Sequence, residues 1–258
     1  MADKAKLNKL AKKILDDEVI DEEEVEEIRE LIYKDGNIDR EEADFLFKLN
    51  DDSVGSENDP SWKELFVEAL TDYVLKDEKS PDVLDAEEAA YLIKKIKANG
   101  IVDENELALM ANITSKATEC DKSFNEFILS SLKEIILENK VVFEHEVEMI
   151  KNIIYGEGSG GGSSVDREEA DFLFELNKGT SEEENCPEWK DLFIEAITKY
   201  VLEDKSSPNE IDEKEAEWII SKIEKDGKYD KNEKALLKNL KNKAKKIHPK
   251  LKAKLDAL

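Results

Sequence analysis

The sequence predicts an all-α protein made of two tandem, homologous multi-helix domains. Three observations support this prediction: a helix-favouring composition, a duplicated stretch and a recurring helix-start signal. Glu, Lys, Leu, Ile and Ala dominate the 258 residues, which include only 10 Gly and 5 Pro. Such a composition favours helices. The alternating apolar runs that are typical of strands are missing.

A twelve-residue stretch occurs twice in the chain with a single difference. Residues 39–50 read DREEADFLFKLN, and residues 166–177 read DREEADFLFELN. The match continues downstream at an offset of 127 residues, for example from Trp62 to Trp189. Upstream, KKILDDEVID and EIILENKVVF match at an offset of 122 residues, so the second copy begins before the duplicated stretch. A period this long indicates two domains rather than a solenoid of short units.

We therefore predict one repeat over residues 1–120 and a second over residues 121–258, each with roughly six helices joined by tight, Asp-capped turns. The offset changes at a Gly/Ser-rich loop, residues 156–164, inside the second repeat. This composition is typical of a flexible linker, and the sequence alone does not tell whether the loop is native or engineered.

Apolar residues at spacings of three and four place the helices along the chain. In the first helix this stripe is Leu7, Leu10 and Ile14. Gly36 and Gly100 follow the ends of later helices, where glycine is the usual cap. The predicted helices include residues 4–15, 62–75, 121–138, 232–246 and 251–258. Further helices open at Asp21, Asp39, Asp85 and Asp103 and at the matching positions of the second repeat.

The opening signal of these helices is Asp-x-x-Glu. In such a capping box the Asp accepts a backbone N–H and the Glu reaches back to the Asp backbone, which stabilises the helix by about 1 kcal/mol. One slot has Phe143 in place of the Asp, followed by Glu146. The boxes are Asp21/Glu24, Asp39/Glu42, Asp85/Glu88, Asp103/Glu106, Asp166/Glu169, Asp212/Glu215 and Asp230/Glu233.

The alternative interpretation of these boxes is binding of a hard cation. Their spacing after a Gly is similar to the second half of an EF-hand loop. With Gly36 at the sixth position, however, the first and third positions fall on Leu31 and Tyr33, which offer no carboxylate. An ordinary EF-hand is therefore excluded, whereas a carboxylate cluster assembled from several helices stays open.

The stretches KDGNIDREE, ANGIVDENE and EKDGKYDKNE resemble the tellurite-resistance TerB family. The helices WKELFVEALTDYVL and WKDLFIEAITKYVL are similar to those of uncharacterised bacterial proteins allied to that family. The resemblance implies an acidic, all-α binding module that acts in stress responses and binds a divalent cation such as calcium or magnesium. The metal ligands that it implies are Asp35, Asp39, Glu42, Asp103, Glu106, Asp226, Asp230 and Glu233.

The charge of the chain narrows the class of partner. The formal net charge is −25, which repels nucleic acid and anionic membranes and attracts basic proteins. No apolar run reaches the length of about 18 residues that spans a bilayer, and the N-terminus lacks a signal-peptide pattern. Two cysteines, Cys120 and Cys186, form no disulfide framework. These features predict a cytoplasmic protein.

The C-terminal segment departs from the acidic balance. Residues 222–258 contain thirteen Lys and five acidic residues. Either these lysines lie on a solvated helix pair, or the segment docks on an acidic surface of its own body or of a second copy.

No nucleophile, base or cofactor motif stands out, so the sequence predicts no enzyme. Two hypotheses for function follow. The first is a TerB-like binding module with a divalent metal. The second is a scaffold or adaptor whose acidic faces bind basic proteins and whose boxes only cap helices.

Overall fold

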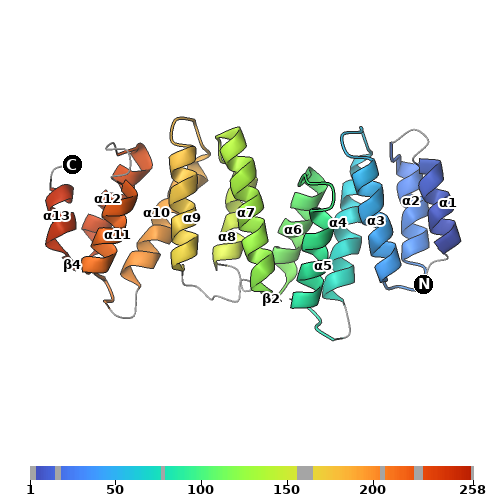
Figure 1. Cartoon of the computed structure of the whole chain (residues 1–258), viewed down its shortest axis with the longest axis horizontal. Coiled ribbons are helices and arrows are strands. Elements are labelled where there is room, and N and C mark those ends of the chain that lie inside the picture. The colour runs from blue at the N-terminus through green and yellow to red at the C-terminus, as the bar shows by residue number, and fades with distance from the viewer. Residues whose placement is uncertain are drawn as a thin grey trace. The chain divides into compact units, whose positions relative to one another are not determined.

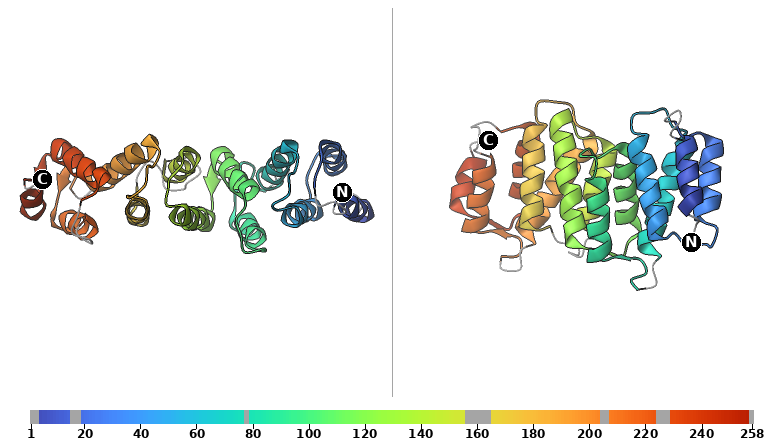
Figure 2. Two further views of the ribbon diagram at one scale, coloured as in Figure 1. Left: turned by 90° about the horizontal axis from the view of Figure 1, so that it is seen from above. Right: turned by 45° about the vertical axis from the view of Figure 1, so that its right-hand side comes forward.

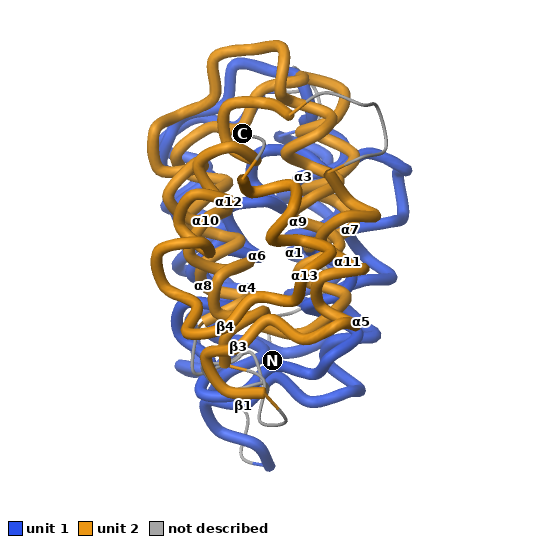
Figure 3. The backbone as a smooth tube through the Cα atoms, turned by 90° about the vertical axis from the view of Figure 1, so that its left-hand side faces the viewer, with its two compact units in different colours: residues 1–128, 157–160 blue, residues 129–156, 161–258 orange. Residues whose placement is uncertain are grey.

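The computed structural model describes residues 4–14, 19–76, 79–155, 165–203, 207–223 and 229–256. These residues divide into two compact units, unit 1 up to Ile128 and unit 2 from Leu129 (Figure 3). The described part of the chain is almost entirely helical, which confirms the all-α prediction (Figure 1). None of the described helices combines the length and the apolar character needed to cross a bilayer.

The described residues of unit 1 form six helices and the beginning of a seventh. Figure 2 shows them side by side in two layers. They are α1 (Lys4–Ile14), α2 (Glu22–Ile32), α3 (Arg40–Asp52), α4 (Pro60–Leu75), α5 (Ala86–Ile96), α6 (Glu104–Lys116) and the first part of α7 (Lys122–Asn139).

Unit 2 contains the second part of α7 and the remaining helices. These are α8 (Glu144–Tyr155), α9 (Arg167–Gly179), α10 (Pro187–Leu202), α11 (Glu213–Ile223), α12 (Lys231–Lys243) and α13 (Pro249–Leu255).

The central helix of each unit is the one that begins with a buried tryptophan. In unit 1, α4 packs against α2, α3 and α6, and in unit 2, α10 packs against α8, α9 and α12. Trp62 and Trp189 are at most 1% exposed, and each lies beside a buried phenylalanine of its own helix. Burial of such large apolar side chains against several neighbouring helices is the main source of stability for these units.

Helices α4 and α6 run in the same direction. The side chain of Lys63 meets Glu104 near their first turns, and Asn112 donates to Thr71 near their ends. In both pairs the partner lies 41 residues later in the chain, a constant register that only parallel helices give. The N-termini of α4 and α6 therefore lie at the same end of unit 1.

Four two-residue strands were not predicted. They form two parallel pairs, β1 (Val83–Leu84) with β2 (Glu119–Cys120) and β3 (Glu210–Ile211) with β4 (Lys246–Ile247). Each pair links the turn after the central helix to the turn two helices later. Segments this short show no alternating pattern, so they cannot be recognised as strands from the sequence.

The residues that start these links adopt a left-handed backbone. Asp82 has φ of 61° and Asn209 has φ of 62°, and each backbone carbonyl accepts a backbone N–H, from Thr118 and Lys245 respectively. Asp and Asn tolerate this conformation better than other non-Gly residues. The same turn is thus stabilised by the same chemistry in both units.

All seven predicted capping boxes are present. In six of them both hydrogen bonds of the box are formed at the start of a described helix. In the seventh, Glu215 N–H donates to Asp212 at 3.1 Å and Asp212 N–H donates to Glu215 at 2.9 Å. At the incomplete slot, Phe143 N–H donates to Glu146 at 2.8 Å, so the half of the box that the sequence retains is formed.

Replacing a capping Asp that is not a metal candidate measures what a box contributes to stability. In Asp85→Ala, the N–H groups of Glu87 and Glu88 lose their acceptor. The free energy of unfolding should fall by about 1 kcal/mol. Chemical denaturation followed by circular dichroism checks this. The control is Ala at Glu87, an exposed first-turn residue whose side chain caps nothing, and an equal loss there would contradict the capping role.

Candidate functional site

The carboxylates predicted to bind metal lie at the starts of three different helices. Asp39 and Glu42 begin α3, Asp103 and Glu106 begin α6, and Asp230 and Glu233 begin α12. In each pair the Asp accepts N–H groups of its own helix and the Glu accepts the N–H of the Asp. The structure therefore brings these six predicted residues together only in pairs. In each pair the carboxylates already accept the backbone hydrogen bonds of the capping box.

The other two predicted ligands do not extend these pairs. Asp35 is exposed in the turn after α2, and its carboxylate accepts the N–H of Asn37 at 3.4 Å. Asp226 lies outside the described residues. Among the residues that the structure describes, no group of three or more His, Cys, Asp or Glu side chains is arranged to hold a metal ion. Metal binding at these positions stays a prediction.

The carboxylate of Asp103 accepts a hydrogen bond from another helix in addition to capping its own. One carboxylate oxygen accepts the N–H of Glu106 at 2.9 Å, and the other accepts the amide of Asn50 at 2.6 Å. The amide of Asn105 in turn donates to the side-chain oxygen of Asn50 at 2.8 Å. Asn50 is 2% exposed, so its end of this network is shielded from water, whereas Asp103 and Asn105 are half-buried. It joins the end of α3 to the start of α6.

The same network occurs in unit 2, at positions 127 residues later. Asn177 donates to Asp230 at 2.7 Å, and Asn232 donates to Asn177 at 2.8 Å. The Asn at the end of the duplicated stretch thus has a structural role in both units. Sequence analysis missed this role because the partner lies more than 50 residues away in the chain.

The Arg and the second Asp of the duplicated stretch form a cluster with aromatic residues. In unit 1 the guanidinium of Arg40 lies 3.5 Å above the ring of Tyr91, whose hydroxyl donates to Asp44 at 3.0 Å. Lys95 pairs with the same carboxylate at 2.7 Å. Burial opposes ionisation of Asp44, but hydrogen bonds from Lys95 and Tyr91 outweigh it and lower the pKa.

In unit 2 the corresponding cluster contains a tryptophan. Arg167 lies over the ring of Trp218, whose indole N–H donates to Asp171, and Lys222 pairs with that Asp. The cluster fastens α9 to α11 as its counterpart fastens α3 to α5. These side chains are therefore part of the scaffold of each unit.

A cleft in unit 1 is the strongest candidate for a binding site. Its volume is about 500 Å³, and we call it the unit 1 cleft. Its walls are Asn50, the connection between α3 and α4 (residues 53–59), the first turn of α4, and residues 103–105 at the start of α6. The parallel arrangement of α4 and α6 is what brings these two helix starts to one cleft.

The charge of the unit 1 cleft is predominantly negative. Four of its lining residues are acidic, and Lys63 is the single basic one. The ammonium of Lys63 is paired with Glu104 at 2.5 Å. Val54, on the connection between α3 and α4, exposes its apolar side chain at the cleft. The acidic lining residues are Glu57, Asp59, Asp103 and Glu104.

Two buried groups near the cleft lack hydrogen-bond partners. The indole N–H of Trp62, which lines the cleft, has no acceptor, and one carboxylate oxygen of Glu106 has no donor. The indole N–H of Trp189 in unit 2 is also unpaired. Because the unpaired indole occurs in both units, it belongs to the fold and does not by itself indicate a ligand.

The environment of Glu106 changes its ionisation. Its side chain is fully buried at the start of α6. Burial, together with the nearby carboxylates of Asp103 and Asp51, raises the pKa of Glu106 to about 8, although the N–H of Asp103 works in the opposite direction. The carboxyl group is thus mostly protonated at neutral pH.

A shallower groove lies further along α4 and α6. It has a volume of about 380 Å³ and an apolar floor that includes Val67 and Ala108. Its charged residues are of both signs, and Glu68 is already paired with Arg29 at 2.7 Å. This balance gives the groove no preference for a ligand of either charge.

The described cysteines and histidines form no catalytic arrangement. Burial raises the pKa of the Cys120 thiol to about 11 and also raises that of Cys186, so neither is a thiolate at neutral pH. His145 stacks on Phe143, and His248 caps α13 by accepting the N–H of Lys250. No hydrogen bond between described residues joins either histidine to a cysteine or a serine.

The basic C-terminal segment docks within unit 2. Lys250 pairs with Glu213 at 2.8 Å and with Glu217 at 2.5 Å, which fastens α13 to α11. Lys246 pairs with Glu210 at 3.3 Å, across the strands β3 and β4. Of the two forms of docking predicted, this is the intramolecular one. Self-association through the segment stays a prediction.

Comparison with known proteins found no match: no family model, no curated protein and no solved structure is similar to the chain. The resemblance to the TerB family therefore rests on the quoted motifs alone.

Glu106 should make the stability of the protein depend on pH. Its pKa is higher in the folded chain, at about 8, than the ordinary value of 4.5 in the unfolded chain. The stabilising effect of its protonated form is complete below pH 4.5 and is lost as the pH rises through 8. In Glu106→Gln this dependence should disappear, because the amide stays neutral and still caps the helix.

Thermal melting between pH 5 and pH 9 measures the effect. The melting temperature of Glu106→Gln should match that of the wild type near pH 5 and exceed it near pH 9. Glu87→Gln, at an exposed position, is the control and should follow the wild type throughout. A constant difference at all pH values would show that the substitution acts through packing.

The metal prediction is tested by titration with calcium, magnesium and a transition metal in a calorimeter. If the boxes are only caps, no heat of binding and no rise of the melting temperature are expected, since a ligand of the folded state raises that temperature. Binding that is lost in Asp39→Asn or Asp103→Asn, but kept in Asp85→Asn, would instead establish a site at the predicted ligands.

Proposed function

We propose that the protein is a non-enzymatic binding module whose unit 1 cleft receives a basic segment of a protein partner. The observation that carries this proposal is the charge of the cleft. Four acidic residues surround a volume of about 500 Å³, and the one lysine among the lining residues is neutralised by Glu104.

The size and lining of the cleft favour a peptide segment over a free ion. Pockets of roughly 300–1,000 Å³ hold drug-sized ligands, which are far larger than a single ion. The carboxylate of Glu57 is exposed and can pair with Lys or Arg. The exposed carboxylate of Glu104 is paired with Lys63, so a basic side chain of the partner would share it, and Val54 offers an apolar contact. An alternating basic and apolar segment satisfies both features.

The net charge of −25 supports the same partner class. A field of this sign draws cationic partners toward the protein and speeds their association, with an effect that salt weakens. The whole surface attracts cationic partners, whereas the unit 1 cleft adds a concave binding surface at one defined position.

Unit 2 provides an internal comparison. At the positions matching Asp59 and Glu104, unit 2 has Cys186 and Lys231. Two of the four carboxylates are thus absent there, and one is replaced by a positive charge. The proposal therefore assigns the basic segment to unit 1.

The metal-binding alternative has less support from the geometry. Both oxygens of Asp103 and of Asp230 already accept hydrogen bonds from amide groups of the protein. A metal would have to displace capping interactions that hold the helix starts. The stress-response role implied by the TerB resemblance forms no part of the proposal.

A peptide titration tests the proposed function. The probe is an amidated peptide of about ten residues that alternates Lys or Arg with Leu. The double variant Glu57→Gln/Glu104→Gln should bind it roughly tenfold more weakly than the wild type in a calorimeter. Raising the salt from about 50 to 500 mM should weaken wild-type binding.

The matched control is Glu138→Gln/Glu148→Gln, which removes the same charge from two exposed positions of α7 and α8. It should bind the peptide as the wild type does. Equal weakening in both double variants would show a general charge effect and reject the cleft, as would absence of binding to the wild type at low salt.

A further inference from the structure

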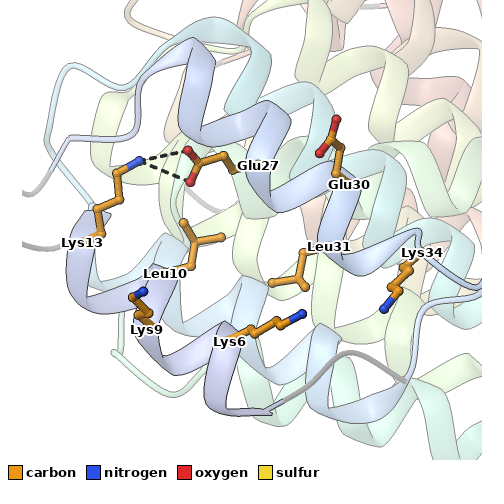
Figure 4. Close-up of a pocket in the computed structure, with 8 residues that line it drawn as sticks. All are labelled: Lys6, Lys9, Leu10, Lys13, Glu27, Glu30, Leu31 and Lys34. Carbon is orange, nitrogen blue, oxygen red and sulfur yellow. Dashed lines mark hydrogen bonds and ion pairs between the residues drawn. The ribbon is translucent and has the colours of Figure 1, made fainter.

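A second groove, of opposite character, lies between α1 and α2 of unit 1. Its volume is about 550 Å³, and we call it the N-terminal groove (Figure 4). Its lining combines two leucines with four lysines and two glutamates, an excess of positive charge that is unusual for a protein of net charge −25. The lining residues are Lys6, Lys9, Leu10, Lys13, Glu27, Glu30, Leu31 and Lys34.

The leucines form an apolar floor. Leu7 and Ile14 of α1 are buried in the core, whereas Leu10 is only half-buried, and so is Leu31 of α2. Figure 4 shows Leu10 and Leu31 extending toward one another between the two helices. A partner that covers them gains the free energy of apolar burial, about 25 cal/mol per Å².

The lysines around this floor are available for a partner. The sequence of α1 has five lysines and no acidic residue. Lys13 is paired with Glu27 at 3.2 Å, but Lys6, Lys9 and Lys34 make no ion pair with any described residue. In Figure 4, Lys6 and Lys34 extend along the side of the floor where no carboxylate is drawn. The groove therefore presents unpaired positive charge beside apolar surface.

The matching face of the second repeat is apolar and buried. At an offset of 122 residues, Leu10, Glu27 and Leu31 correspond to Leu132, Met149 and Ile153. These three are at most 5% exposed. A face of this helix pair is thus able to form a packed contact. In its first occurrence the chain leaves that face open and surrounds it with lysines.

We propose that the N-terminal groove binds an acidic amphipathic helix of a partner protein. Leucine-sized residues on one face of that helix would cover Leu10 and Leu31, and its flanking carboxylates would pair with Lys6, Lys9 and Lys34. Helices α1 and α2 each have eleven residues, so the groove between them is about 16 Å long. This length accommodates about three turns of a partner helix.

Charge and shape together favour this occupant over a nucleic acid. A nucleic acid would meet the lysines but would also bring its phosphates into the field of a chain with net charge −25. It has no apolar face for the two leucines. An acidic peptide has few enough charges to be held by three lysines.

The test uses a designed peptide of about 18 residues with Leu at helical spacing on one face, Glu at about four flanking positions and Ala or Gln elsewhere. A labelled peptide is titrated with the full chain, and binding is read from fluorescence anisotropy. The variant Lys6→Glu/Lys9→Glu should bind roughly tenfold more weakly than the wild type. A scrambled peptide of the same composition should bind at least roughly tenfold more weakly to the wild type.

The matched control is Lys12→Glu/Lys94→Glu, which makes the same change of charge at exposed lysines outside the groove. It should retain wild-type affinity within about twofold. Equal loss in both double variants, equal binding of the scrambled peptide, or no binding to the wild type would each overturn the proposal. Tighter binding of a single-stranded oligonucleotide, lost in Lys6→Glu/Lys9→Glu, would also overturn it.

Discussion

The carboxylate of Asp103 holds two helices of unit 1 at once, and the geometry of the proposed binding cleft depends on it. One oxygen caps α6 and the other accepts the amide of Asn50 at the end of α3. Both partners are hydrogen-bond donors that would otherwise be poorly satisfied in a buried place. Because Asn50 and Asp103 both line the unit 1 cleft, this network holds the end of α3 against the start of α6 at the cleft.

The sequence predicts the features of this fold that depend on neighbouring residues. The capping boxes and the helices that follow them are local patterns, and all seven boxes form as expected. The partners that join Asn50, Arg40 and Asp44 to other helices lie far away in the chain, so these roles became clear only in the structure. The turn residue Asp82 is a similar case, since its carbonyl meets an N–H 36 residues away.

The candidate sites were harder to predict than the fold. A carboxylate in a capping box and one in a metal site have the same sequence spacing, and only the three-dimensional contacts separate them. The lysines of α1 and the charged residues of α2 do repeat at helical spacing around Leu10 and Leu31. That pattern is compatible with a basic groove, whereas the net negative charge of the chain indicates acidic surfaces only. The net charge adds up all residues of the chain, so it does not reveal that unit 1 carries two surfaces of opposite charge.

The tryptophans give the chain a built-in means of observing its units separately. Trp62 is the only tryptophan of unit 1, and the other two, Trp189 and Trp218, lie in unit 2. All three are buried, so their emission shifts when the surrounding helices separate. With phenylalanine at both positions of unit 2, fluorescence would report the unfolding of unit 1 alone. Comparison with circular dichroism would then reveal whether the two units unfold in one cooperative transition or in sequence.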